Sequence, residues 1–271
     1  MHARAQQCLR GAVVAVMLLA WLGLPPPMGA QRRREPSMRT PDGKPNLNGI
    51  WQALNTANWD IQDHSAQAGP PQFGALFSMP AGQGIVVGNE IPYKASALAR
   101  KQANFANRFT LDPEAKCYMP GIPRATYMPF PFQIVQGTSK IMMVYEFAGA
   151  NRIIHLDSVP PPPANSWMGH STGRWDGDTL VVDVTSQVDQ TWFDRAGNFH
   201  SDLLHVVERF SLPDRDHLQY DIAVEDPEVF TRPWRMAMPL YRRVEPNAVR
   251  LEFKCVEFSE ELLYGHLRKK P

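Results

Sequence analysis

Hydrophobic and polar residues alternate with a period of two along most of the second half of the chain. The clearest stretch is residues 217–225, in which Leu218, Tyr220, Ile222 and Val224 share one face and mostly polar residues share the other. Successive side chains of a β-strand point to opposite faces, so this pattern predicts a strand with one buried side. The same alternation marks further predicted strands: FQIVQ (132–136), KIMMVYEF (140–147), RIIHLDS (152–158), DTLVVDV (178–184), HVVERFSL (205–212), PWRMAMPLYRR (233–243) and VRLEFKCVEF (249–258).

Turn residues separate these segments. Residues 137–139 join the first two predicted strands, and Asp176 and Gly177 lie between GRW and DTLVVDV. An Asp-Gly pair between alternating segments predicts a β-hairpin with a type I′ turn, whose two central residues both need a positive φ. Short strands joined by turns predict a mainly β fold, an antiparallel barrel or strongly curved sheet that is lipocalin-like in the loose sense.

The region before these strands lacks such a period. Residues 31–131 are interrupted by Pro and Gly, which predicts an irregular wrap around the sheet, with one Ala-rich helix over about 92–108. We therefore expect a single domain over 31–271, in which the antiparallel sheet occupies 132–258 and a C-terminal tail with a short helix occupies 259–271.

The first thirty residues have the order of a secretory signal peptide. Arg4 and Arg10 precede the apolar run 11–24, and small residues at Gly29 and Ala30 provide a cleavage site. The run is shorter than the about 20 residues of a comfortable membrane span. We expect cleavage after Ala30 and a periplasmic or secreted protein without stable membrane insertion; an uncleaved anchor is the alternative.

Charge argues against one class of partner. Removal of residues 1–30 takes two arginines and no acidic residue, which leaves 26 basic against 27 acidic residues. A near-neutral chain with basic clusters only at its two ends gives no electrostatic case for binding nucleic acid.

Two cysteines remain after cleavage, Cys117 and Cys255. In an oxidising compartment an even number predicts a disulfide, here between the segment before the sheet and the last predicted strand. The alternative is a pair of buried thiols.

A long polar loop, residues 186–202, lies between two predicted strands and carries Trp192, Phe193, Asp194 and His200. A loop of this length inside a compact domain is often functional or disordered, and two large aromatic residues favour an ordered one.

Carboxylates on apolar faces are the first candidates for chemistry. Glu208 shares a strand face with Leu204, Val206 and Phe210, whereas His205 and Arg209 share the other face. Glu146 similarly shares a face with the apolar residues Met142 and Val144. Burying a lone charge is very costly, so a carboxylate on such a face needs a partner, a proton or a polar cavity. The two carboxylates could form an acid/base pair; alternatively each ends in a salt bridge, for which Arg124, Arg152, Arg174 and Arg209 are available.

Histidines are the second candidates. His155, His170, His200 and His205 lie on or beside neighbouring predicted elements. Three converging imidazoles, or two with Asp194, would make a zinc or copper site, but the spacing fits no known metal motif. Individually, each histidine is better explained as a hydrogen-bonded or surface residue, and no cofactor is predicted.

Three functions follow from these residues. The first is an exported enzyme of the lyase, isomerase or hydrolase type that acts on a small apolar or sugar-like molecule, with His205 or His200 as general acid/base and Asp194 or Glu208 as its carboxylate partner. The second is a lipocalin-like periplasmic carrier without chemistry, and the third is a metal-dependent enzyme. The predicted ligand-binding residues are Trp167, Trp192, Glu146, Tyr145 and Arg209. A pocket with a histidine bonded to a carboxylate favours the enzyme, and an apolar cup without them favours the carrier.

Several segments together are similar to one family: TPDGKPNLNGIWQ, KCYMPGIPRATYMP, WMGHSTGRWDGDTLVVDV, HVVERF and EDPEVFTRPW. They resemble a family of uncharacterised secreted proteins of environmental bacteria, over nearly all of the mature chain. The resemblance implies export and a single domain, and it transfers no catalytic residue.

Overall fold

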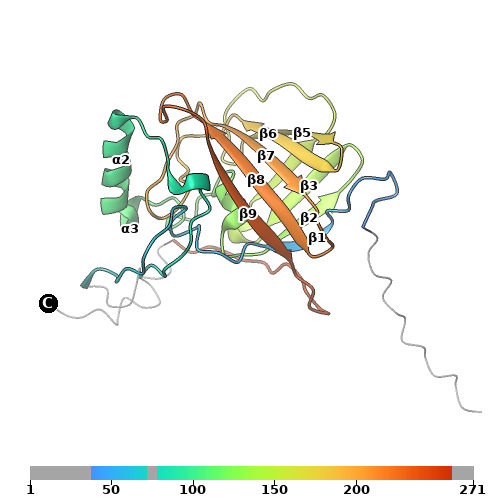
Figure 1. Ribbon diagram of the computed structural model, residues 1–271, viewed down its shortest axis with the longest axis horizontal. Coiled ribbons are helices and arrows are strands. Elements are labelled where there is room, and N and C mark those ends of the chain that lie inside the picture. The colour runs from blue at the N-terminus through green and yellow to red at the C-terminus, as the bar shows by residue number, and fades with distance from the viewer. Residues whose placement is uncertain (1–37, 72–77, 258–271) are drawn as a thin grey trace, which may run out of the picture. The chain divides into compact units, whose positions relative to one another are not determined.

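Nine strands close into a barrel in the computed structural model, and each lies next to the strand that follows it in the sequence (Figure 1). The structure describes residues 38–71 and 78–257. The predicted signal peptide, residues 1–30, and the predicted tail, residues 259–271, lie outside the described residues. The strands are β1 (Gly49–Gln52), β2 (Phe132–Gln136), β3 (Lys140–Tyr145), β4 (Asn151–His155), β5 (His170–Asp176), β6 (Thr179–Thr185), β7 (His205–Ser211), β8 (His217–Glu225) and β9 (Trp234–Arg242).

The predicted β-barrel is confirmed, but its strands are not all antiparallel. β4 and β5 run parallel, with Ile154 opposite Ser171. A parallel pair needs a crossover instead of a tight turn, and residues 156–169, which include the proline run, provide it. The barrel is therefore mainly antiparallel, as predicted, with one parallel pair that the sequence pattern did not indicate.

The ends of the sheet also differ from expectation. β1 lies inside the region predicted as a wrap and pairs with both β2 and β9, with Trp51 opposite Arg242. Since β1 takes the free edge of β9, the barrel is closed and no edge remains for a further strand. The predicted strand over 249–258 is accordingly absent from its described part, residues 249–257, which are irregular.

The central hairpin forms one residue later than expected. Asp176 pairs with Thr179, so the two turn residues are Gly177 and Asp178. Gly177 has a φ of 59°, whereas Asp178 does not have a positive φ. A glycine with positive φ at the first central position is typical of a type II′ turn, so the predicted type I′ turn was wrong.

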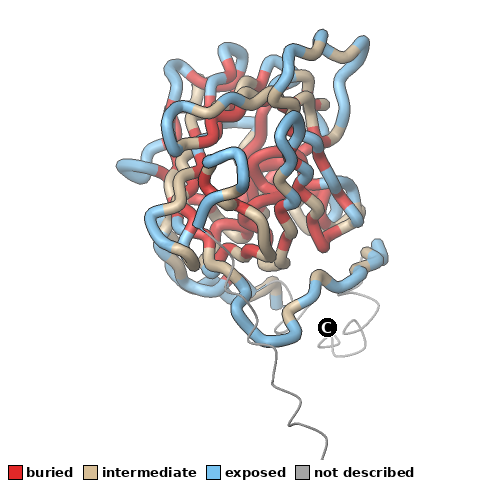
Figure 2. Tube along the Cα trace, turned by 90° about the vertical axis from the view of Figure 1, so that its right-hand side faces the viewer, coloured by how far each residue is buried: buried red, intermediate tan, exposed pale blue. Residues whose placement is uncertain are grey.

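The barrel interior is filled by the faces that the two-residue period predicted. Leu218, Tyr220, Ile222 and Val224 are all buried. Figure 2 shows the buried chain concentrated inside, with exposed chain around it. The barrel is therefore a packed core and not an open cup.

Short helices lie outside the barrel: η2 (Val87–Asn89), α2 (Ala95–Ala106), α3 (Arg108–Leu111), α4 (Arg124–Tyr127) and η3 (Phe147–Gly149). α2 falls within the predicted helix 92–108 and packs on the loop 186–204. Gly197 of that loop has a φ of 82°, and a Cβ there would lie 2.7 Å from the backbone nitrogen of Phe105. Glycine is thus required both by backbone conformation and by the close approach to α2.

The predicted disulfide is confirmed. Cys117 and Cys255 are joined across 138 residues, with their Cα atoms 5.5 Å apart. The bond ties the irregular C-terminal segment, residues 243–257, to the segment between β1 and β2. A disulfide is compatible with an oxidising compartment.

Candidate functional site

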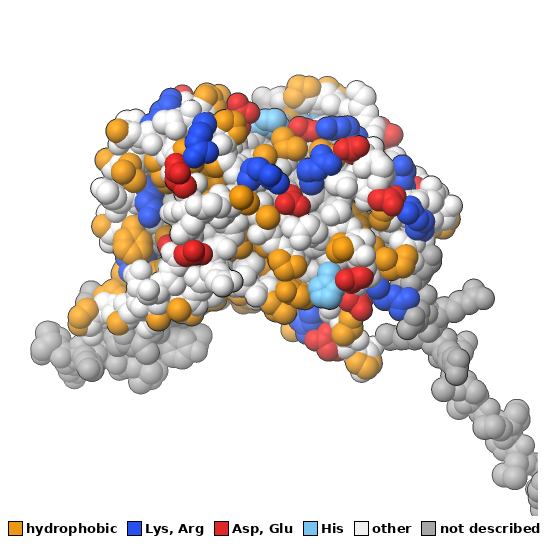
Figure 3. Space-filling view, viewed as in Figure 1, with side chains coloured by type: hydrophobic (Ala, Val, Ile, Leu, Met, Phe, Trp, Pro, Cys, Tyr) orange, Lys and Arg blue, Asp and Glu red, His pale blue; other side chains and the backbone are white. Residues whose placement is uncertain are grey.

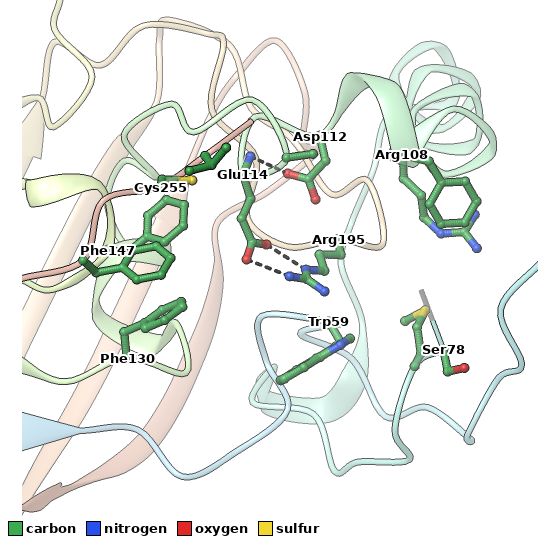
Figure 4. Close-up of a pocket in the computed structure, with 14 residues that line it drawn as sticks. Trp59, Ser78, Arg108, Asp112, Glu114, Phe130, Phe147, Arg195 and Cys255 are labelled. Carbon is green, nitrogen blue, oxygen red and sulfur yellow. Dashed lines mark hydrogen bonds and ion pairs between the residues drawn. The ribbon is translucent and has the colours of Figure 1, made fainter. Parts of the chain in front are cut away.

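A cavity of about 180 Å³ lies beside the barrel, where several segments that are far apart in the sequence meet (Figure 4). We call it the aromatic pocket. Its apolar walls are formed by Trp59, Met79, Phe109, Phe130, Phe147 and Phe253. Its polar groups are Arg108, Asp112, Glu114 and Arg195.

Three phenylalanines form one end of the aromatic pocket. The ring of Phe130 lies 5.5 Å from that of Phe147 and 4.9 Å from that of Phe253. Phe253 belongs to the C-terminal segment, two residues before Cys255. The disulfide therefore holds part of the pocket wall in place.

A buried ion-pair cluster forms the middle of the aromatic pocket. Arg195 donates to both carboxylate oxygens of Glu114, at 2.8 Å each, and its guanidinium lies 5.5 Å from the ring centre of Trp59. Arg124 donates to Glu114 at 2.7 Å and to Asp112 at 3.0 Å. Burial alone would raise the pKa of Glu114, but Arg195 and Arg124 outweigh it and lower the pKa to about 2. The two carboxylates thus engage Arg124 and Arg195.

Arg108 lies at the opposite edge of the pocket from Phe130 and Phe147 in Figure 4. Its guanidinium carbon is 4.0 Å from the ring centre of Phe105 and 4.2 Å from that of Phe109. It donates to the carbonyl oxygen of Phe105 at 2.7 Å, and burial lowers its pKa. No carboxylate among the described residues forms an ion pair with it. Arg108 is therefore a half-buried cation whose charge is not compensated by a described acidic residue.

Asp194 is fully buried away from this pocket's surface. It accepts hydrogen bonds from the backbone nitrogens of Ile61 (3.0 Å) and Asn198 (3.1 Å) and from the Asn198 side chain (2.6 Å). Burial and the nearby Asp60 raise its pKa to about 7. The carboxyl group joins the loop 186–204 to the N-terminal segment, and its predicted role as a catalytic partner stays untested.

His200 is also buried in that loop. Its Nδ1 lies 2.8 Å from the carbonyl oxygen of Ser201, so Nδ1 carries the proton, and Nε2 accepts from the hydroxyl of Thr191 at 2.6 Å. Burial lowers its pKa, which keeps the ring neutral. The ring contacts no carboxylate within hydrogen-bond distance among the described residues.

His205 lies on the outer face of β7. Its Nε2 is 3.3 Å from Asp183, and its side chain is 38% exposed. Arg209, two residues on, donates to Asp176 at 3.0 Å on the same face. Figure 3 shows basic and acidic side chains interspersed on the face it views. His205 and Arg209 thus belong to the solvated outer surface, and neither lines the aromatic pocket.

Glu208 points into the barrel, as the strand period predicted. Arg152 donates to its two oxygens at 2.6 and 3.0 Å, and the hydroxyl of Tyr220 donates to one of them. Glu208 strongly raises the pKa of Arg152 against the opposing effect of burial. The salt-bridge alternative for Glu208 is confirmed, with Arg152 as the partner.

The prediction that Glu146 is inside the barrel was wrong. Met142 is exposed and Ile141, Met143 and Tyr145 are buried, so the face that leads to Glu146 is the outer one. Glu146 is buried because the C-terminal segment covers it, and the backbone nitrogen of Leu251 donates to it at 3.1 Å.

The remaining predicted ligand-binding residues do not line the aromatic pocket. Tyr145 is buried in the barrel, where its hydroxyl lies 3.3 Å from that of Thr126. Trp192 is buried in the loop 186–204, and the ring of Trp167 lies 4.8 Å from that of Tyr118. These aromatic residues pack the scaffold.

The histidines proposed as metal ligands do not converge. His155 and His170 lie together, with ring centres 5.7 Å apart, whereas His200 is in the loop and His205 is on β7, separated from His170 on β5 by strand β6. Within residues 38–71 and 78–257, no three His, Cys, Asp or Glu side chains form a group that could hold a metal ion.

Comparisons with models of protein families, with curated proteins and with solved structures find no match. The site must therefore be interpreted from its own geometry. In the described part of the chain, no helix is both long enough and apolar enough to cross a membrane.

Little in the sequence indicates the aromatic pocket. Its residues come from separate segments of the chain, and the local patterns of these segments do not show that Arg108 lies near Phe130 or Phe147. One signal was present: a disulfide from Cys117 to Cys255 brings the C-terminal segment beside residues 112–118. That constraint would have placed Phe253 close to Glu114.

Proposed function

We propose that the chain is a non-catalytic binding protein for a small aromatic carboxylate, held in the aromatic pocket beside the barrel. The observation that carries the proposal is Arg108, a cation without a described acidic partner at the edge of a cavity whose apolar walls are mostly aromatic. Binding sites are commonly apolar cavities with a few polar groups that fix the orientation of the ligand.

Charge supports an anionic ligand. Asp112 is paired with Arg124, Glu114 is paired with both Arg124 and Arg195, and all four groups are buried or partly buried. An incoming carboxylate would therefore meet Arg108 as the group that still lacks an anion. Guanidinium and carboxylate match in geometry, because two parallel N–H donors meet two oxygens.

Size and lining support a single aromatic ring. The pocket volume of about 180 Å³ is close to the roughly 150 Å³ of an apolar cavity known to hold benzene. Trp59, Phe130 and Phe147 offer ring faces and edges with which an aromatic ligand can pack.

The enzyme hypothesis has less support. Among the described residues, no histidine lines the aromatic pocket. His200 lies in the loop 186–204, and His205 shares β7 with Glu208 but is on the outer face, whereas Glu208 is on the inner one. Acid/base catalysis needs a proton-transferring group within hydrogen-bond reach of the substrate. We also retain export as a proposal, and the disulfide is compatible with it.

The test uses calorimetric titration with benzoate and with benzamide, its neutral analogue of nearly the same shape. Benzoate should bind more tightly than benzamide to the parent protein, and Arg108→Gln should weaken benzoate binding about tenfold or more while changing benzamide little. Arg100→Gln is the matched control, because Arg100 lies on α2 and stacks on Phe199 outside the pocket. Equal affinity of the parent for both compounds, or no effect of Arg108→Gln, would contradict the proposal.

A further inference from the structure

Two histidines lie close together on the outer face of the barrel, away from the aromatic pocket. Ile154 of β4 pairs with Ser171 of β5, and both are buried on the inner face. Their sequence neighbours His155 and His170 therefore project to the outer face, as diagonal neighbours across the parallel pair. The ring centres are 5.7 Å apart and the ring planes are inclined by 27°.

Each ring has one shielded nitrogen that lacks a hydrogen-bond partner. These atoms are Nδ1 of His155 and Nε2 of His170, and no donor or acceptor in residues 38–71 or 78–257 reaches either of them. Buried polar atoms are almost always paired, because an unpaired one is destabilising. A single bound ion that accepts the lone pairs of both nitrogens would explain why neither has a hydrogen-bond partner.

The surroundings of His155 favour the neutral form of its imidazole ring, which is the form that can bind a metal ion. Burial, His170 and Lys140 lower the pKa of His155, and Asp157 opposes them. A neutral imidazole keeps the lone pair that a metal ion needs. Lys140 is opposite His155 in the β3–β4 pair.

We propose that His155 and His170 together bind a Cu²⁺ ion. Imidazole is a preferred ligand of copper, and Cu²⁺ binds nitrogen and oxygen ligands more tightly than the neighbouring divalent ions do. Among the described residues, no third His, Cys, Asp or Glu joins the pair. Two imidazole ligands leave coordination positions for water or another small ligand, unlike the four protein ligands of a closed structural centre.

The test is a titration of the full, untagged, metal-free protein with copper sulfate, followed by electron paramagnetic resonance. One Cu²⁺ should bind per chain with coupling to two nitrogens, and His155→Gln and His170→Gln should each weaken binding about tenfold or more. His217→Gln is the matched control, because His217 is exposed on β8 and already bonded to Asp214. Copper binding at the parent's affinity in either test variant, or coupling to fewer than two nitrogens, would overturn the proposal.

A second measurement on the parent protein covers the case in which a variant folds poorly. Copper is paramagnetic, so a small amount of it should broaden the imidazole signals of His155 and His170 before those of the other histidines. Earlier broadening at His205, which lies near Asp183 and Glu225, would place the ion there and contradict the proposal.

Discussion

Arg195 binds both carboxylate oxygens of Glu114, at 2.8 Å each, although 81 residues separate the two in the sequence. The pair joins the loop 186–204 to the segment between β1 and β2. Arg124 binds the same carboxylate at 2.7 Å, so one acidic group holds two guanidinium groups in place. The ion pairs thereby fix the middle of the aromatic pocket, and the pocket depends on them.

Glu114→Gln should be strongly destabilising. The change leaves Arg124, which is 1% exposed, with one fewer anionic partner, and removing one partner of a buried pair costs about 3–5 kcal/mol. Urea denaturation should measure the loss in the free energy of unfolding. Glu90→Gln is the control, because Glu90 is 69% exposed in its pair with Arg232 and should change stability by less than about 0.5 kcal/mol. A cost for Glu114→Gln as small as the control's would contradict this account.

Substitution of the two histidines predicted to be catalytic, His200 and His205, should reduce the stability of the protein by different amounts. His200→Ala opens a buried space and leaves the Thr191 hydroxyl and the Ser201 carbonyl unpaired, so we expect a cost of about 2–4 kcal/mol. His205→Ala removes a partly exposed ring and should cost less than about 0.5 kcal/mol. Thermal unfolding of both variants measures the difference. Similar losses at both positions would show that the placement of one ring is wrong.

The alternation of apolar and polar residues predicted most of the fold, because every second residue of a barrel strand points into the apolar interior. That period correctly put Glu208 and Tyr220 inside, and the even number of cysteines after the predicted cleavage correctly led to the disulfide. The two-residue period did not determine the register of the central hairpin, because Asp176, Gly177 and Asp178 are all common turn residues. β1 is only four residues long, too short to show a period of its own.

The candidate site was hidden for a different physical reason. Loops 186–204 and 106–131 are held by side-chain ion pairs and hydrogen bonds between distant segments, and such contacts leave no periodic trace. The polar residues of the long loop were recognised as important, but burial of Asp194 and His200 shows that they order the loop. Arg108, Phe130 and Phe147 cannot be recognised as parts of one site in the sequence, because only the fold brings them together.

Stability should depend on pH through Asp194. Its pKa is raised from 3.8 to about 7 by burial and by Asp60, so its contribution is fully present below the unfolded pKa and declines as the pH rises towards about 7. Asp60→Asn removes the negative neighbour but keeps an oxygen for the Gln62 backbone nitrogen. The decline in the free energy of unfolding between about pH 4 and pH 8 should therefore be smaller in Asp60→Asn.

Denaturation at a series of pH values checks this expectation. His200 has a lowered pKa and so an opposite pH dependence, but it is common to both proteins and cancels in the comparison. Asp42→Asn, a change at an exposed carboxylate, should follow the parent. Identical declines in the parent and Asp60→Asn would refute the coupling of Asp60 to Asp194.

Removal of the disulfide should loosen the pocket as well as the chain. Replacing Cys117 and Cys255 with Ala opens a loop of 138 residues, and loss of the closed-loop constraint should cost about 3–5 kcal/mol. Phe253 is then held only by packing, so benzoate affinity should fall in the protein that remains folded. Chemical denaturation and calorimetry measure the two effects. Full affinity in the folded double variant would mean that the C-terminal segment is not part of the binding wall.

The most direct test of the binding account is a crystal structure of the protein soaked with 4-iodobenzoate, because anomalous scattering locates the iodine without bias. The account predicts the ligand in the aromatic pocket, with its carboxylate in hydrogen-bond contact with Arg108 and its ring against the aromatic walls. Iodine at another position, or a carboxylate that faces away from Arg108, would contradict it.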